Sequence, residues 1–329
     1  MIRPTRPAPT GINNTALGIL CGMGAGALWG FVFVAPELVR DFSPLQIAVG
    51  RYVAYGLISA ILIRPRWLEL TCTLTGRDWL MLMSLATAGN ILYFVLLSAA
   101  VQKAGIAPAS LVIGFLPVIV TIAGSRAKGA VSLRALTPSL LLCGSGALCV
   151  GWRALEDPGV GSGGDHLLGL LYAFGALGSW SAYAVFNTRS LARLPRISAR
   201  DWTLLTGVVT GAQALLLAPV TLLSGPVQHT LPSWALLAMV SIGLAVAASI
   251  IASALWNRMS RLLPLTMVGQ MILFETLFAL IYGFLWERRL PLPVELAAAA
   301  FVVAGVLACI RAHRPSRASS AFGAVPIGE

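Results

Sequence analysis

Long apolar runs, separated by short polar connections, follow one another along almost the whole chain. A bilayer core about 30 Å thick is crossed by roughly 20 residues of α-helix, and ten runs approach that length. We expect helices, because lipid offers no partners for unpaired backbone groups and the runs lack the alternation of membrane-barrel strands. The ten predicted spans are 15–34, 45–63, 79–99, 107–124, 137–152, 167–187, 202–223, 233–256, 264–285 and 293–310.

The composition supports an all-α membrane protein. Hydrophobic residues make up 57% of the 329 residues and charged residues 11%, whereas soluble domains are about 25% charged. A soluble fold of this size has no means of hiding so much apolar surface from water. The five cysteines contain no CxxC pair, so neither a metal site nor a disulfide framework is indicated.

The positive charges predict the orientation in the membrane. The net charge is +11, but the basic residues stand at the ends of apolar runs and form no nucleic-acid-binding domain. With the N-terminus in the cytoplasm, 17 of the 23 lysines and arginines fall on the cytoplasmic side, which is a strong positive-inside bias. We therefore expect a multi-pass protein of the cell membrane with both termini cytoplasmic. The opposite side keeps Arg40, Lys103, Arg153, Arg288 and Arg289.

The two halves of the chain match each other at a constant offset of 159 residues. At this offset Pro117 falls on Thr276 and Gly124 falls on Gly283. Five spans per half is an odd number, so the second half enters the membrane from the opposite side, as in the inverted repeats of secondary transporters. The predicted organisation is a cytoplasmic tail (1–14), a first five-helix repeat (15–152), a linker loop (153–166), a second five-helix repeat (167–310) and a basic cytoplasmic tail (311–329).

Other classes of membrane protein find less support. The three histidines lie outside the predicted spans, and neither HExxH nor GxSxG is present, so an enzyme is not expected. The chain also has no GxxxxGK[ST] motif for an ATP-driven pump, and no cofactor is implied. A membrane-embedded receptor or scaffold without transport activity is the alternative, although the connections are too short for a sizeable extramembrane domain.

Six segments of the chain carry a resemblance to a known family. They are GALWG (26–30), SPLQIAVGRY (43–52), APASLVIGFLPVIVTIAG (107–124), GSWSAYAVFNTR (178–189), FETLFALIYGFLWERRL (274–290) and VVAGVLACIR (302–311). In order and along nearly the whole chain, these segments resemble the EamA-type ten-helix transporters of the drug/metabolite transporter superfamily. This resemblance implies export or exchange of small polar or amphipathic metabolites, without ATP, through a cavity between the halves. One departure is Glu275-Thr276, where the family often has Glu-Pro in the ninth helix.

Two charged residues lie inside apolar runs and are the leading candidates for function. Intramembrane charges cost about 2.5–3.5 kcal/mol at a helix centre, so they usually face a cavity or a partner. Arg51 either attracts an anionic group of the substrate or caps carbonyls and extends to the headgroups. Glu275 either binds a substrate ammonium or changes protonation during transport, with H⁺ then as the coupling ion, or it is a protonated or hydrogen-bonded structural acid that ties its helix to a neighbour. Together they suit an amino-acid-like zwitterion, without excluding a drug-like substrate.

Five further residues within the runs have side chains with a polar N–H, O–H or amide group that suits a cavity wall. Tryptophan and tyrosine, however, also form belts at the membrane interface. These further substrate-binding candidates are Trp29, Asn90, Tyr93, Trp180 and Tyr183. Pro117, Gly124 and Gly283 are expected to have structural roles in helix bending and packing. Glu287, beside Arg288 and Arg289, is expected to form a structural ion pair at a helix end.

Overall fold

The secondary structure of the described residues is entirely helical, which confirms the all-α prediction. The structure is a computed structural model and describes residues 14–124, 132–156, 163–223 and 229–312. The elements are α1 (Asn14–Leu38), α2 (Pro44–Ile63), η1 (Arg64–Arg66), α3 (Trp67–Thr73), α4 (Gly76–Ala86), η2 (Thr87–Leu92), α5 (Tyr93–Ala104), α6 (Ile106–Ile113), α7 (Leu116–Gly124), α8 (Leu133–Glu156), α9 (Gly163–Arg193), α10 (Ala199–Leu223), α11 (Leu231–Leu244), η3 (Ala245–Ala252), α12 (Ser253–Leu262), α13 (Leu265–Met271), α14 (Leu273–Glu287) and α15 (Pro293–Ala312).

Seven helical segments among the described residues are long and apolar enough to cross a membrane. Three of the ten predicted spans are not among them, and these coincide with α6 and α7, with α8, and with α15. The span predicted at 107–124 is divided by a turn at Gly114 and Phe115, so that neither half reaches the length of a crossing helix. The seven segments are Asn14–Leu38, Pro44–Thr73, Gly76–Ala104, Leu167–Arg193, Ala199–Thr221, Leu231–Leu262 and Met267–Trp286.

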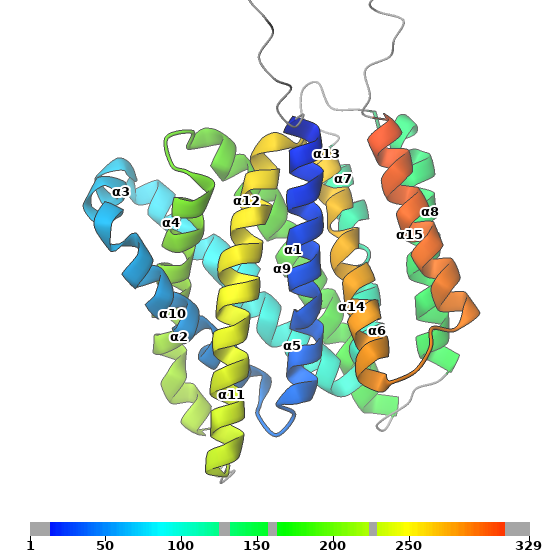
Figure 1. Cartoon of the computed structure of the whole chain (residues 1–329), viewed down its shortest axis with the longest axis horizontal. Helices are drawn as coiled ribbons and strands as arrows, with labels where there is room; N and C mark the ends of the chain where they lie inside the picture. Colours follow the sequence, from blue (N-terminus) through cyan, green and yellow to red (C-terminus); the bar gives the residue numbers. More distant parts are fainter. Residues whose placement is uncertain (1–13, 125–131, 157–162, 224–228, 313–329) are drawn as a thin grey trace, which may run out of the picture.

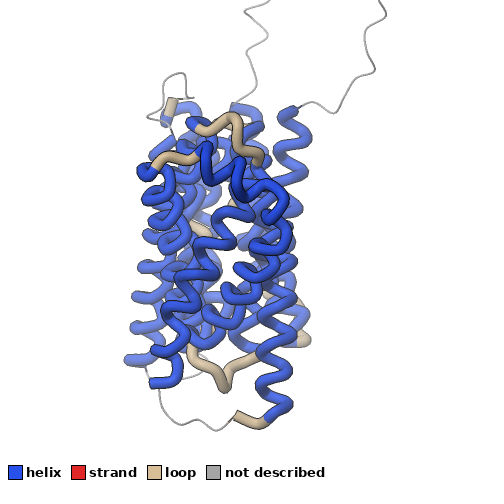
Figure 2. The backbone as a smooth tube through the Cα atoms, turned by 90° about the vertical axis from the view of Figure 1, so that its left-hand side faces the viewer, coloured by secondary structure: helices blue, strands red, loops and turns tan. Residues whose placement is uncertain are grey.

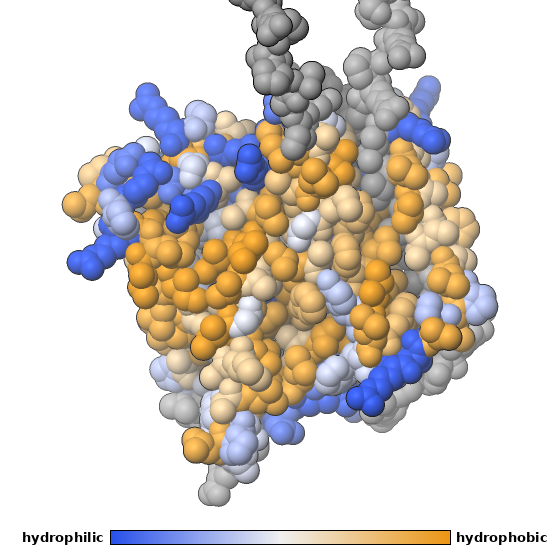
Figure 3. Space-filling view, in the orientation of Figure 1, coloured by the Kyte–Doolittle hydropathy of each residue, from blue (hydrophilic) through white to orange (hydrophobic). Residues whose placement is uncertain are grey.

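An apolar belt crosses the bundle on the face seen in Figure 3. Hydrophobic residues cover the middle of the face seen in Figure 3, and hydrophilic residues gather toward its two ends. Large apolar side chains point outward within this belt, among them Ile61 of α2 and Leu216 of α10, which are 71% and 79% exposed. Such exposure suits lipid rather than water as the surrounding medium. The chain is therefore a multi-pass membrane protein.

The helices lie side by side along a common direction (Figures 1 and 2). The start of α1 and the end of α15 lie at the same end of the bundle, which we call the terminal end (Figure 1). Four helix pairs make the most extensive contacts: α2 with α10, α8 with α15, α1 with α14, and α5 with α9. All four pairs join a helix of the first half of the chain to a helix of the second half.

Two of the long helical segments are each interrupted by a π-helical segment. η2 joins α4 to α5, and η3 joins α11 to α12. Both are held by side chains from other helices, because the Trp29 indole N–H donates to the carbonyl of Ala248 (2.9 Å) and the Ser179 hydroxyl donates to that of Ala88 (2.7 Å). π-Helical turns leave carbonyl groups available for such bonds and occur frequently at functional sites.

Glycines let α1 and α14 approach closely. A Cβ atom added at Gly26 would lie 2.7 Å from the Cβ of Phe274 and 2.8 Å from the backbone nitrogen of Glu275. One turn further on, a Cβ at Gly30 would meet Phe278 at 2.9 Å. This is the contact that small residues at helix interfaces make possible in lipid, and it fixes the height of Glu275 against α1.

The predicted structural residues have varied surroundings. Pro117 and Gly124 are the second and last residues of α7, and Gly283 of α14 faces Ile106, whose Cγ2 would lie 3.6 Å from an added Cβ. Glu287 ends α14, but its side chain is outside the described part of the structure, so its predicted ion pair is not tested. The predicted tails fall mostly outside the described residues, on 1–13 and 313–329, and so do residues 157–162 of the predicted linker.

Candidate functional site

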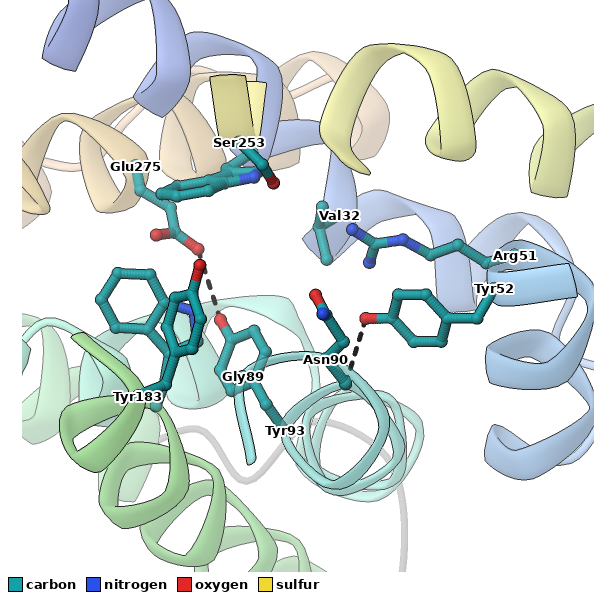
Figure 4. Close-up of a pocket in the computed structure, with 11 residues that line it drawn as sticks. Val32, Arg51, Tyr52, Gly89, Asn90, Tyr93, Tyr183, Ser253 and Glu275 are labelled. Atoms are coloured by element: carbon teal, nitrogen blue, oxygen red, sulfur yellow. Dashed lines mark hydrogen bonds between the residues drawn. The ribbon is translucent and has the colours of Figure 1, made fainter. Parts of the chain in front are cut away.

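One pocket at the middle of the bundle, which we call the central pocket, brings together all seven substrate-binding candidates named from the sequence (Figure 4). Its cavity volume is about 20 Å³, which is close to the space that one water molecule occupies. In this conformation the side chains themselves fill most of the site. The lining residues are Trp29, Val32, Arg51, Tyr52, Gly89, Asn90, Tyr93, Trp180, Tyr183, Ser253 and Glu275.

Glu275 enters the pocket from the first turn of α14, directly after the turn at Ile272 that separates α13 from α14. The residue is 3% exposed. Its Oε1 accepts a hydrogen bond from the Tyr93 hydroxyl at 3.3 Å, whereas its Oε2 is buried without a partner among the described residues (Figure 4). Burying a hydrogen-bond acceptor without a partner costs folding free energy, so well-packed protein cores rarely contain one. One side of this carboxyl group is therefore available to a ligand or a proton.

Arg51 projects from α2 toward the opposite part of the pocket (Figure 4). The residue is 5% exposed, and its Nε donates to the Ser249 hydroxyl at 3.0 Å. Its guanidinium carbon lies 4.4 Å from the ring centre of Phe94 and 5.0 Å from that of Tyr52. No salt bridge and no bond to a backbone carbonyl holds Arg51 in the described part of the chain, so ring faces and one hydroxyl balance its charge.

Aromatic rings form part of the pocket wall. The rings of Trp29 and Trp180 meet edge to face at 5.6 Å, and Trp256 lies 5.3 Å from the first and 5.1 Å from the second. Tyr183 extends this wall from Trp180, at 5.6 Å. Gly89 of η2 permits the approach of Tyr183, because an added Cβ would collide with the tyrosine ring. Trp256 is not among the candidates predicted from the sequence, because its position at the end of the predicted span 233–256 resembles that of an interface tryptophan.

Asn90 lies on η2 and joins two helices at the pocket. Its side-chain nitrogen donates to the Thr210 hydroxyl of α10 at 3.0 Å, and its backbone carbonyl accepts from the Tyr52 hydroxyl at 3.0 Å. Tyr52 and Ser253 are further lining residues that were not predicted from the sequence. The signal for Tyr52 was present in the sequence, because this residue, with its hydroxyl group, directly follows Arg51 in the same apolar run.

A buried set of amide and hydroxyl groups, the amide cluster, lies beyond the tryptophans toward the terminal end. Asn187 of α9 donates to the side-chain oxygen of Asn257 of α12 at 2.9 Å, and Asn257 donates to the Thr203 hydroxyl of α10 at 2.8 Å. The Trp202 indole donates to the Asn187 oxygen at 2.8 Å. Asn187, Asn257, Trp202 and Thr203 are each 1% exposed. Their mutual bonds tie three helices together above the pocket.

Comparison with known proteins shows similarity at the level of family, of sequence and of fold. The model of the EamA-like transporter family matches residues 16–149 and again residues 167–311. The inner membrane protein YtfF of Escherichia coli (strain K12) is 31% identical over 317 residues, which cover 90% of this chain and 95% of that protein. A protein of known crystal structure superposes with a TM-score of 0.65 over 89% of this chain and 98% of its own, at 17% identity, which is a likeness in fold.

Proposed function

This chain belongs to the EamA-like transporter family, and from that premise we propose that it is a secondary transporter. It moves a small polar or amphipathic metabolite across the cytoplasmic membrane by alternating access, in the direction of export. The family matches both halves of the chain separately, which supports a transporter built from two related units. The short connections between helices leave transport to the membrane-embedded residues themselves.

Ten spans in two inverted five-helix repeats are the architecture that we propose. Paired irregularities support it: the 159-residue offset carries η2 onto residues 246–251, inside η3, and carries the start of α6 at Ile106 onto the start of α13 at Leu265. The divisions between α6 and α7 and between α13 and α14 fall within two residues of each other at this offset. Such matched interruptions are typical of duplicated transporter halves, with the site between them.

The pocket chemistry favours a substrate that carries both an ammonium and a carboxylate. The free oxygen of Glu275 suits an ammonium group, and the guanidinium of Arg51, which has no acidic partner, suits a carboxylate. Between them the tryptophan and tyrosine rings offer apolar faces to the body of the molecule. We infer an amino-acid-like substrate, bound when the side chains that now fill the pocket move apart.

Glu275 is also the residue that we propose couples transport to H⁺. A carboxyl group that contacts the substrate can bind either a proton or the substrate ammonium, and competition between the two drives exchange across a pH gradient. The hydroxyl of Tyr93, 3.3 Å away, gives this carboxyl a fixed hydrogen-bond partner while the other oxygen exchanges partners.

The observation that carries the proposal is the meeting of Arg51 and Glu275, from the two halves of the chain, in one buried pocket. The test is uptake of radiolabelled amino acids and other small metabolites into proteoliposomes, with and without an imposed pH gradient. We expect saturable uptake of at least one zwitterion, faster with the gradient and independent of ATP. No uptake of any zwitterion above that of protein-free liposomes would contradict the proposal.

A further inference from the structure

A second cavity, which we call the lateral groove, lies on the outer side of the pocket wall, between α4 with η2 and α9. Its volume is about 420 Å³, within the range of roughly 300–1,000 Å³ that is usual for ligand sites. Most of its lining is apolar. The lining residues are Arg77, Leu80, Met81, Ser84, Leu85, Ala88, Ala182, Tyr183 and Phe186.

The groove has the depth of one membrane leaflet. Its lining residues on α4 and η2 recur every three or four positions, so they form one helix face from Arg77 to Ala88. At 1.5 Å per residue this face is about 16 Å long, close to half of a hydrocarbon core about 30 Å thick. It runs from the terminal end to the depth of the central pocket, which is the depth that a lipid acyl chain reaches.

Unpaired arginines stand at the terminal end of the groove. Asp78 and Arg193, 3.6 Å apart, fix the start of α4 beside the end of α9, so Arg77 and Arg189 lie at the same end. Arg77 lines the groove, and the guanidinium carbon of Arg189 lies 5.9 Å from the ring centre of the lining residue Phe186. In the described part of the chain neither makes a salt bridge, whereas Arg193 does. Apolar walls under a basic rim match the two ends of an anionic phospholipid.

The groove and the central pocket share part of a wall. Tyr183 lines both, and Ala88, whose carbonyl accepts the Ser179 bond, adjoins the pocket residue Gly89. An acyl chain in the groove would press on the outer face of the Tyr183 ring and support it against the pocket. The groove is therefore a place where the bilayer can act on the site without entering it.

We propose that the lateral groove binds one anionic phospholipid of the leaflet at the terminal end. One acyl chain lies along Leu80, Met81 and Leu85, and the phosphate lies between Arg77 and Arg189. The proposal depends on the membrane location of the chain but not on what it transports.

The test is native mass spectrometry of the purified protein with phosphatidylglycerol or phosphatidylcholine of identical acyl chains. Wild-type protein is expected to bind phosphatidylglycerol more tightly, by about fivefold for each arginine. The Arg77→Gln/Arg189→Gln variant is expected to bind the two lipids equally. The Arg196→Gln/Arg200→Gln variant, which removes two exposed arginines from the connection between α9 and α10 and from the first turn of α10, is the matched control and keeps the preference.

A second variant separates the groove from general surface charge. Ala182→Phe fills the groove without changing charge and is expected to reduce the binding of both lipids, at an unchanged unfolding temperature of the lipid-free protein. Equal binding of the two lipids to wild-type protein would overturn the proposal, as would an unchanged preference in Arg77→Gln/Arg189→Gln or full binding to Ala182→Phe. Because lipid binding is measured without transport, a failure of the transport proposal would be visible separately.

Discussion

At the residue scale, the central pocket keeps two ionisable side chains out of water without pairing them to each other by a salt bridge. Glu275 and Arg51 are 3% and 5% exposed. Burying a charge is unfavourable unless hydrogen bonds or an opposite charge compensate, and here one hydroxyl serves each group, with two ring faces for Arg51. A bundle selected for stability alone would place apolar side chains at both positions. The incomplete compensation is what a substrate with both charges would complete.

Glu275→Gln tests the coupling role directly. The amide keeps the size of the side chain and accepts the Tyr93 bond, but it cannot take up or release a proton. We expect uptake into proteoliposomes with a pH gradient to fall to the level measured without one, and the pH dependence of uptake to disappear. Glu69→Gln, which removes an exposed acid paired with Arg66, is the control and leaves both unchanged. Wild-type pH dependence in Glu275→Gln would assign the coupling to another group.

Arg51 is expected to act on substrate affinity more than on the maximal rate. Arg51→Gln removes the charge that we assign to the substrate carboxylate, and hydrogen bonds to charged groups contribute about 1.5–3 kcal/mol, so we expect KM to rise roughly tenfold to a hundredfold. Ser249→Ala removes only the hydroxyl that orients the guanidinium and should raise KM a few-fold. Concentration-dependent uptake of the zwitterion by both variants measures this. Equal KM values for Arg51→Gln and wild-type protein would leave Arg51 with a structural role.

The sequence identified part of this site, for reasons that differ between residues. Glu275 and Arg51 stand out because each is a lone charge in an apolar run, so composition alone isolates them. Trp256 and Tyr52 escaped, since an aromatic residue in a span fits a core, a belt or a pocket equally well. Gly89 escaped because its role depends on the ring of Tyr183, a residue 94 positions away, which no local pattern reveals.

At the element scale, the contact between α1 and α14 sets where Glu275 stands. Glycines 26 and 30 place the backbone of α1 directly against α14, so a side chain on this face of α1 would displace the first turn of α14. Since that turn contains Glu275, helix packing and site geometry depend on the same few atoms.

Gly26→Ala is expected to destabilise the protein. The added methyl group would lie 2.8 Å from the Glu275 nitrogen, and overpacking of this kind costs about 1–3 kcal/mol, more than the gain of about 1 kcal/mol in helix propensity. Gly178→Ala on α9 is the control, because an added Cβ there meets nothing within 4 Å. Thermal unfolding in detergent should show a lower unfolding temperature for Gly26→Ala alone. An unchanged temperature would mean that the two helices are free to separate.

Hydropathy predicts where helices run but not where they are interrupted. The runs at 79–99 and 233–256 are continuous in apolarity, yet each contains a π-helical segment. The extra residue in these turns is stabilised by the Ser179 and Trp29 bonds from other helices, so its position depends on tertiary structure. The turn at Gly114 and Phe115 likewise lies inside an apolar run, and Gly114 by itself does not distinguish a break from close packing.

At the scale of the whole molecule, the proposed topology makes opposite predictions for the two ends of the bundle. Cys72 of α3 is exposed near the terminal end, and Asp41, in the turn between α1 and α2, is exposed at the other end. A membrane-impermeant maleimide added to intact cells should label Asp41→Cys in a Cys72→Ser background and leave Cys72 of the wild type unlabelled. Inverted membrane vesicles should give the reverse. Labelling of Cys72 from outside would reverse the orientation derived from the basic residues.

The alternating access that we propose requires the terminal end to open, and the amide cluster is one of the contacts that must then separate. Asn257→Ala removes the hydrogen bonds of Asn257 with Asn187 and Thr203, so the remaining Trp202–Asn187 pair is no longer linked to α12. Leaving the buried Asn187 amide nitrogen without its acceptor destabilises the closed conformation by about 1–3 kcal/mol. A change of that size shifts a two-state equilibrium about 5- to 150-fold, so the open form should gain population.

Spin labels on the exposed positions Ala192 of α9 and Arg258 of α12, with the native cysteines replaced by serine, report this opening as a longer distance in pulsed electron resonance. Ser179→Ala removes a hydrogen bond of similar strength between α9 and η2, not between α9 and α12, and should leave the distribution unchanged. A longer distance in Asn257→Ala alone would show that the amide cluster stabilises the closed conformation at the terminal end. If the distance distributions of both variants equal that of the wild-type protein, contacts other than the amide cluster, such as those among the three tryptophans, are sufficient to keep the terminal end closed.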